Sequence, residues 1–250
     1  MKSKPIQQLF LIITLVLVVL TGCKKDDKKA DDPKPVKPDP ATVTDIDGNT
    51  YKTVRINTQL WMAENLRVTR FNDGTSIPTT DPPDIDITED PQGMYGCIYQ
   101  WITMYDTTLL EDLGRVYSSG VGTHNLRNVC PEGWRVPTRK DWKTLIADLQ
   151  EKPDSNRLEE GHILMEKNSL YWEPSSNPFV EAPNNETGFT ARGGGIRWAK
   201  GGEWHNFKRS AGFMIQDYQW AAFAFIGDTG QAGIGYGHHS PNRHIRCIME

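Results

Sequence analysis

The sequence lacks any stripe of positive charge. Its 28 Lys and Arg residues are outnumbered by 32 Asp and Glu residues, and the net charge is −4. Proteins that bind nucleic acid through its phosphates need basic residues gathered on one face or along one helix. The composition therefore excludes nucleic acid as an expected partner.

The sequence also lacks the short motifs of common catalytic chemistries. It contains no Gly-x-Ser-x-Gly, no His-Glu-x-x-His and no phosphate-binding loop. Residues 193–195 are glycines, but the Lys and the Ser or Thr of a phosphate loop do not follow them, which favours a tight turn. Carboxylates are plentiful, yet a sequence does not show whether two of them face one another across a sugar. We expect no enzymatic activity and no cofactor.

One group of residues has part of the spacing of a calcium loop. Asp45, Asp47 and Asn49 stand at its first, third and fifth positions. The glycine is at the fourth position rather than the sixth, and Ile56 replaces the final Glu. We therefore expect a hairpin turn here and no metal.

A histidine cluster near the C-terminus is the second metal candidate. It consists of His238, His239 and His244, with Gly, Ser, Pro and Asn around it. No acidic residue follows His239, so the cluster lacks the mixed ligands of many transition-metal sites. A solvated loop is the interpretation we prefer.

The N-terminus has the pattern of a targeting segment. Lys2 and Lys4 precede an apolar run, residues 9–20, which is too short for a comfortable membrane span. The run ends in Leu-Thr-Gly-Cys, which resembles a bacterial lipobox with Cys23 as the lipidated residue. We expect residues 1–22 to be a lipoprotein signal peptide; the alternative is an ordinary secretory signal.

Residues 23–41 predict a disordered tether. Lys, Asp and Pro dominate them, so they cannot bury enough apolar surface to fold. Lys25-Asp26-Asp27 resembles the surface-export signals of Bacteroidetes lipoproteins. We expect a lipid anchor in the outer membrane with the folded domain, residues 42–250, exposed on the cell surface; the alternative is a tether that faces the periplasm.

The cysteines other than Cys23 suit one disulfide and one spare thiol. An exported protein can keep a disulfide. We pair Cys130 with Cys247, because Cys97 lies in the apolar run MYGCIYQW and is expected to be a buried, inert thiol.

Several elements can be predicted from local patterns. Thr138 is a good N-cap with Asp141 three residues later, and apolar residues recur at helical spacing, which predicts a helix over residues 139–150. Residues 41–56 predict a β-hairpin that turns at Asp47-Gly48, and residues 244–249 predict a final strand with alternating faces.

Several blocks together resemble the Fibrobacter succinogenes major paralogous domain, over about residues 42–249. In chain order they are VTDIDGNTYKTVRI, QLWMAENLRVTRFNDGTSIP, MYGCIYQW, CPEGWRVPTRKDWKTL, ETGFTARGGGIR and HIRCIM. The resemblance implies a single α+β domain of the C-type-lectin-like kind, with short twisted antiparallel sheets, about two helices and long loops. The cysteines of its fourth and last blocks match Cys130 and Cys247, which supports their pairing.

Binding is the function class that the sequence favours. Aromatic and polar residues in the Gly-rich segments of residues 192–243 suit contacts with sugar rings or peptide side chains. The candidate ligand-binding residues are Trp198, Trp204, Tyr218, Trp220, Tyr236, His238 and Arg243. We expect a surface lipoprotein with a non-catalytic domain that recognises a glycan or a protein. The alternatives are an accessory subunit of a surface assembly and, less favoured, a polysaccharide hydrolase.

Overall fold

The computed structural model describes residues 39–77, 93–100, 127–150, 157–175, 177–198, 202–216, 222–236 and 242–250. These residues belong to one compact unit, Asp39–Glu250. The expected signal peptide, Cys23 and residues 23–38 of the tether lie outside the described part of the chain. None of the described helices is long and apolar enough to cross a membrane.

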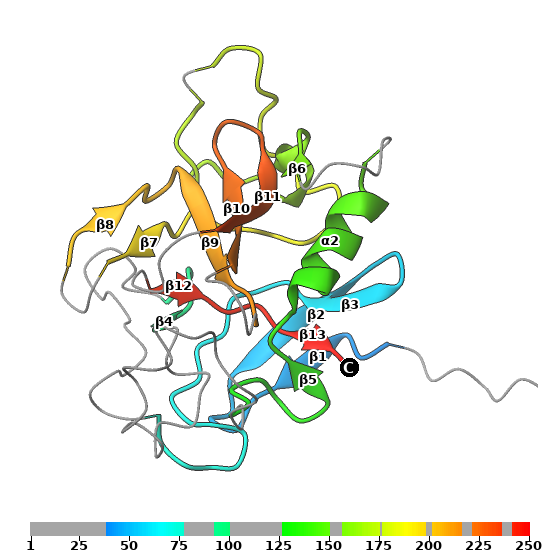
Figure 1. Ribbon diagram of the computed structural model, residues 1–250, viewed down its shortest axis with the longest axis vertical. Helices are drawn as coiled ribbons and strands as arrows, with labels where there is room; N and C mark the ends of the chain where they lie inside the picture. The colour runs from blue at the N-terminus through cyan, green and yellow to red at the C-terminus, as the bar shows by residue number, and fades with distance from the viewer. Residues whose placement is uncertain are drawn as a thin grey trace, which may run out of the picture. The chain divides into compact units, whose positions relative to one another are not determined.

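Two sheets and a small hairpin make up the described strands (Figure 1). The five-stranded sheet has the order β1 (Thr42–Thr44), β2 (Thr50–Ile56), β3 (Gln59–Met62), β13 (Ile248–Met249), β5 (Trp134–Arg135). The six-stranded sheet has the order β4 (Ile98–Tyr99), β12 (Arg243–His244), β9 (Ser210–Met214), β10 (Ala222–Gly227), β11 (Ala232–Tyr236), β6 (Arg157–Leu158). The hairpin pairs β7 (Ile196–Arg197) with β8 (Trp204–His205). β12 runs parallel to β9, and the other described pairs are antiparallel.

The prediction of an α+β domain with about two helices is wrong for the part of the chain that the structure describes. One α-helix, α2 (Arg139–Asp148), and one short 3₁₀ helix, η3 (Gly161–Leu164), accompany the strands. The described residues are mostly β: the longer strands β2, β9, β10 and β11 are joined by two-residue strands in the loops that pair with distant segments.

Helix α2 begins as the sequence predicts. The backbone N–H of Asp141 donates to the Thr138 hydroxyl, and the Asp141 carboxylate accepts from the Thr138 backbone N–H at 2.6 Å, which completes the capping box. Arg135 holds the same carboxylate with two contacts, at 2.7 and 3.0 Å. Burial alone would raise the pKa of Asp141, but these bonds outweigh it and lower the pKa. The helix ends at Asp148, two residues before the predicted end.

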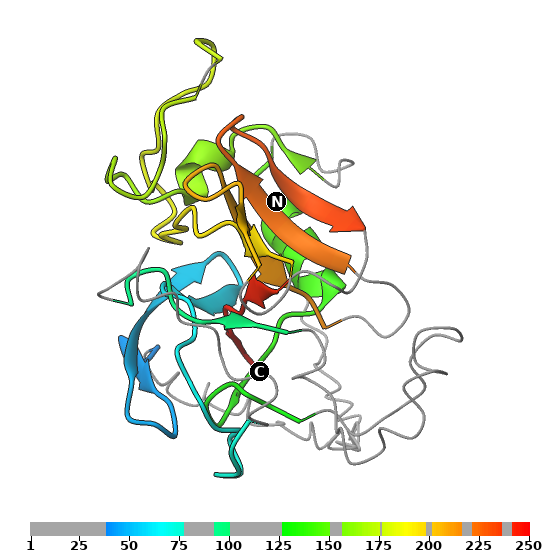
Figure 2. The ribbon, with the colours of Figure 1, turned by 90° about the vertical axis from the view of Figure 1, so that its left-hand side faces the viewer.

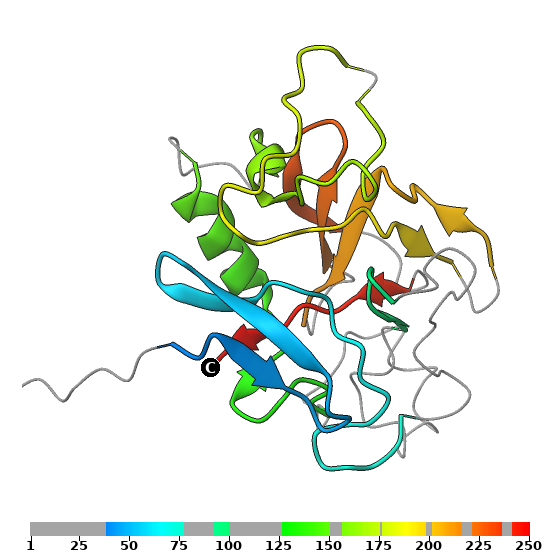
Figure 3. The same cartoon turned by 180° about the vertical axis from the view of Figure 1, so that it is seen from behind.

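An aromatic cluster joins α2 to both sheets. Trp142 of α2 lies 5.1 Å from Trp61 of β3 and 5.3 Å from Phe213 of β9, measured between ring centroids. Phe189 packs within 6 Å of all three rings. All four side chains are buried, so the apolar face of the predicted helix packs into the core. Figure 3 shows α2 lying beside both sheets.

The C-terminal segment passes between the two sheets instead of forming one strand. β12 pairs with β4 and β9, whereas β13 pairs with β3 and β5. Residues 242–248 are all buried, so the predicted alternation of faces over residues 244–249 is wrong. A segment that crosses from one sheet to the other is surrounded by core residues on all sides. The alternation of apolar and polar residues that marks a half-buried strand therefore does not apply to it.

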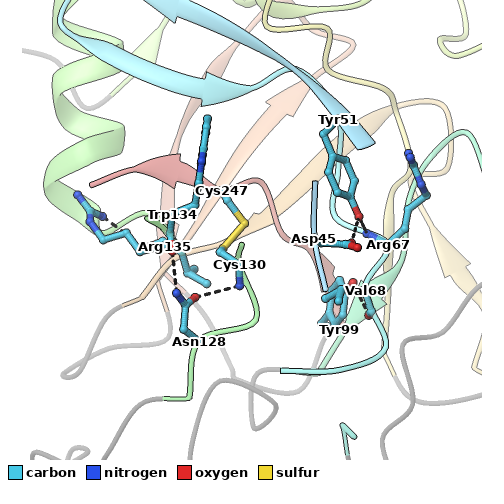
Figure 4. Close-up of a disulfide and its surroundings, with 11 residues drawn as sticks. Asp45, Tyr51, Arg67, Val68, Tyr99, Asn128, Cys130, Trp134, Arg135 and Cys247 are labelled. Carbon is cyan, nitrogen blue, oxygen red and sulfur yellow. Dashed lines mark hydrogen bonds between the residues drawn. A yellow bond between two sulfur atoms is a disulfide. The ribbon is translucent and has the colours of Figure 1, made fainter. Parts of the chain in front are cut away.

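The predicted disulfide between Cys130 and Cys247 is present and ties this segment to the start of β5 (Figure 4). The Asn128 side chain holds the local loop, accepting from the Cys130 backbone N–H at 2.9 Å and donating to the Trp134 carbonyl at 2.6 Å. Trp134 is buried beside the disulfide. The motif CPEGW therefore has an architectural role in this domain.

Candidate functional site

The β7–β8 hairpin carries the first two candidate aromatic residues. Arg197 pairs with Trp204 across the hairpin, so these two side chains share one face. Trp198 follows Arg197 and therefore points to the opposite face, where its ring meets His205 edge-on, with 6.2 Å between centroids. Trp198 is 46 % exposed, which makes it an available aromatic surface. Figure 1 shows the hairpin to the left of β9, with β8 leading into the start of that strand.

Trp204 is half-buried and packs against neighbouring side chains. The guanidinium of Arg197 lies 5.5 Å from the centre of its ring, and Phe207 packs against it at 5.7 Å. Phe207 in turn contacts the buried Tyr95 at 5.0 Å. This chain of rings packs the Arg197–Trp204 face of the hairpin against the domain.

Two further candidates lie elsewhere on the six-stranded sheet. Arg243 is buried, with its guanidinium 4.3 Å from the centre of the Phe223 ring, and burial lowers its pKa to about 10. Tyr236 is 55 % exposed at the end of β11, where Arg139 of α2 lies 5.1 Å from its ring. The described candidates therefore do not form one site: Trp198 and Tyr236 are exposed on different elements, and Arg243 is a packing residue. Tyr218, Trp220 and His238 lie outside the described residues.

The structure contains a pocket that the sequence did not predict. It lies beside the segment that follows η3. Its volume is about 340 Å³. Apolar parts of the wall come from Met165, Trp172, Pro174, Val180 and Pro183. Polar parts come from Lys167, Glu173, Glu181 and Asp228. The signal that could have indicated it is the run Asn-Pro-Phe-Val, in which a lone apolar pair interrupts a polar, Pro-rich stretch.

The outer wall of this pocket is a loop with an exposed phenylalanine. We name it the 173–183 loop; residues 173–175 and 177–183 of it are described. It stands above β10 and β11 at the top of Figure 2. Phe179 is 92 % exposed. Its backbone N–H donates to the Asn177 side chain at 3.0 Å, and the Val180 N–H donates to the Asn177 carbonyl at 3.2 Å, so a local turn with Pro178 presents the ring.

The calcium candidates are engaged in protein hydrogen bonds. Asp45 accepts from the Tyr51 hydroxyl at 2.5 Å (Figure 4). It also accepts from the Asn49 side chain at 3.0 Å. Asp47 accepts from the Thr69 and Arg70 side chains at 2.8 and 2.5 Å. The Asp45 bonds close the turn of the β1–β2 hairpin, which the sequence predicted, and the Asp47 bonds attach this turn to residues 69 and 70. Within the described residues, no three His, Cys, Asp or Glu side chains gather where they could hold a metal.

Two titratable groups of the core are held neutral. His244 is fully buried, with Nδ1 3.1 Å from the Cys97 carbonyl, and burial lowers its pKa to about 4. Cys97 is a free, buried thiol, as predicted, and burial raises its pKa to about 12. Gly194 explains part of the glycine run, because a Cβ there would lie 2.2 Å from the His244 Nε2 atom. The run serves close packing rather than phosphate binding.

Comparison with known families finds one match. The model of the Fibrobacter succinogenes major domain matches residues 54–227, more than half of the chain. The matched range includes α2, the β7–β8 hairpin and the 173–183 loop, and it ends before β12 and β13. No curated protein and no solved structure matches the chain.

Proposed function

The chain belongs to the Fibrobacter succinogenes major domain family. We propose that this member of the family is a surface lipoprotein. Its folded domain recognises a glycan or a protein and does not catalyse a reaction. The anchor is the lipid on Cys23, and the tether that precedes the folded unit Asp39–Glu250 carries it away from the outer membrane. The positive start, apolar run and Leu-Thr-Gly-Cys end of the N-terminal segment support this address.

The observation that carries the proposal is the presentation of Trp198. The ring is about half exposed, yet the two strands of its hairpin and the packed rings under Trp204 restrain its backbone. A rigid aromatic face loses little conformational entropy on binding and can stack on a sugar ring or a peptide side chain. The exposed His205 beside it offers a hydrogen-bonding group at the same face.

A glycan array tests the proposal with the full chain purified in detergent, in calcium and in chelator. We expect specific glycan signals that Trp198→Ala abolishes. The control is Tyr236→Ala, which removes an equally exposed ring on β11 and should leave binding unchanged. Equal loss in both variants would contradict a site at Trp198. If no glycan binds, the glycan form of the proposal fails, and cross-linking from residue 198 on intact cells tests the protein form.

The proposed lipid anchor and cell-surface location need their own experiment. Cys23→Ala should abolish incorporation of labelled fatty acid and release the protein from the membrane fraction. In the unsubstituted protein, protease added to intact cells should digest the folded domain. Protection of the domain on intact cells, with digestion only after outer-membrane lysis, would favour a tether that faces the periplasm.

A further inference from the structure

Two acidic residues that line the pocket behind the 173–183 loop have backbone hydrogen bonds to the segment that contains Arg209. The Glu173 backbone N–H donates to the Lys208 carbonyl at 2.8 Å, and the Asp228 N–H donates to the Arg209 carbonyl at 2.7 Å. Both acidic residues are thereby held beside the start of β9. Arg209 forms an ion pair with Glu173 at 2.8 Å.

Asp228 has a much weaker partner. Within the described residues, the Asp228 carboxylate comes nearest to a charged partner at Arg209 Nη1. The distance is 3.9 Å, which is beyond hydrogen-bond length. The side chain is only 17 % exposed. A carboxylate with so little access to water gains from a positively charged donor placed next to it.

The rest of the pocket suits the stem of a long basic side chain. Trp172, Pro174, Val180 and Pro183 provide apolar wall. Glu181 adds a third carboxylate to the lining, and it lies 3.2 Å from His162 Nε2. Lys167 supplies the one positive charge among the lining residues. The side chains of Arg and Lys combine an apolar stem with a charged head, which matches this division of the wall.

We infer that this pocket binds an Arg or Lys side chain of a partner protein, with the charged head at Asp228 and the stem against the apolar wall. Phe179, on the outer side of the same loop, then provides an apolar contact with the partner next to the pocket. This inference does not depend on the proposed role of Trp198, which lies on a different element.

The alternative occupant of the exposed Phe179 would be a membrane surface. A loop that inserts into an anionic membrane usually carries basic residues around its apolar tip. The described residues of the 173–183 loop include Glu173 and Glu181 and no Lys or Arg. The charge of the loop therefore favours a basic protein over a bilayer.

Ligand-observed NMR tests the inference with two probes and the full chain in detergent. N-acetyl-arginine methylamide carries the expected head and stem, and N-acetyl-citrulline methylamide has nearly the same shape without the charge. We expect the arginine probe to bind at least about fivefold more tightly than the citrulline probe, as one charge contact of moderate strength provides. Asp228→Asn should remove this preference, whereas Glu186→Gln, an exposed carboxylate outside the pocket lining, should retain it.

Equal binding of the two probes, no binding of either, or a preference that survives Asp228→Asn would overturn the inference. A separate measurement addresses the membrane. Phe179→Trp is reconstituted into vesicles that contain brominated lipids, and its fluorescence is compared with that of the unsubstituted chain. Quenching beyond that of the unsubstituted chain would place the loop in the bilayer and overturn the inference, and equal quenching supports a protein partner.

Discussion

Cys130 and Cys247 are 117 residues apart in the sequence and form a disulfide that joins the entrance of β5 to the entrance of β13. The two strands pair with each other in the five-stranded sheet. The bond therefore fixes the C-terminal segment in the position where it connects both sheets.

Removal of the disulfide should strongly destabilise the domain. A loop of this length is expected to contribute about 4–5 kcal/mol in the chain-entropy model. Cys130→Ala combined with Cys247→Ala should lower the free energy of unfolding by that amount and the melting temperature by about 10 °C or more. Thermal unfolding followed by circular dichroism measures the change.

Reductant provides the control for this prediction. It should lower the melting temperature of the unsubstituted protein and leave that of the double variant unchanged. Cys97→Ala, which removes the buried free thiol, should preserve the response to reductant. The same melting temperature with and without reductant would argue against the pairing.

The parts of the fold that sequence predicted are those with local determinants. The cap at Thr138, the spacing of Trp142 and the turn at Asp47-Gly48 are each contained within a few residues. The two-residue strands β4, β6 and β12 have no such signal, because pairing with distant chain segments defines them. The same cause explains why residues 244–249 were expected to form one strand.

His244 should make the stability of the domain depend on pH. Burial lowers its pKa to about 4, whereas the unfolded chain has the ordinary value near 6.5. Between these values the unfolded state binds more protons, so the folded state loses stability as the pH falls from about 6.5 to 4 and reaches the full loss below 4. The difference corresponds to about 3 kcal/mol.

Urea unfolding at pH 7, 6 and 5 measures this loss. The variant His244→Asn keeps a donor near the position of Nδ1, which faces the Cys97 carbonyl, and removes the titration. Carboxylates titrate in both proteins, so the contribution of His244 is the difference between their pH profiles. Parallel profiles would show that His244 does not titrate between the folded and unfolded states.

Arg246 is buried at the centre of the domain, and its hydrogen-bond partners in the described part of the chain are amide and carbonyl oxygens. Its guanidinium donates two bonds to the Asn65 side chain, at 3.0 and 2.7 Å, and further bonds to the carbonyls of Phe189 and Thr190. Arg246→Leu should leave these acceptors without donors and reduce the free energy of unfolding by about 3–5 kcal/mol. Chemical denaturation measures the loss. Arg209→Leu, at an exposed arginine, should cost less than about 1 kcal/mol, and an equal cost at both sites would contradict the prediction.

The candidate site was less predictable than the fold for a geometric reason. Aromatic residues that are close in sequence were expected to act together, but adjacent positions in an extended chain point to opposite faces. Trp204 therefore packs into the domain while Trp198 remains exposed. Phe179 was missed because a single exposed apolar residue in a loop gives no periodic signal.

Measurements of the free energy of unfolding can distinguish a tryptophan that packs in the core from one that is exposed for binding. Trp142 touches Trp61, Phe189 and Phe213 in the core, and Trp142→Ala should cost about 3–5 kcal/mol through lost burial and the cavity left behind. Trp198 makes one edge-on ring contact and is about half exposed, so Trp198→Ala should change the free energy of unfolding by less than about 1 kcal/mol. Urea denaturation of both variants measures these values. A large loss at Trp198 would mean that its ring supports the hairpin, and a loss of ligand binding in that variant would then no longer identify a contact residue.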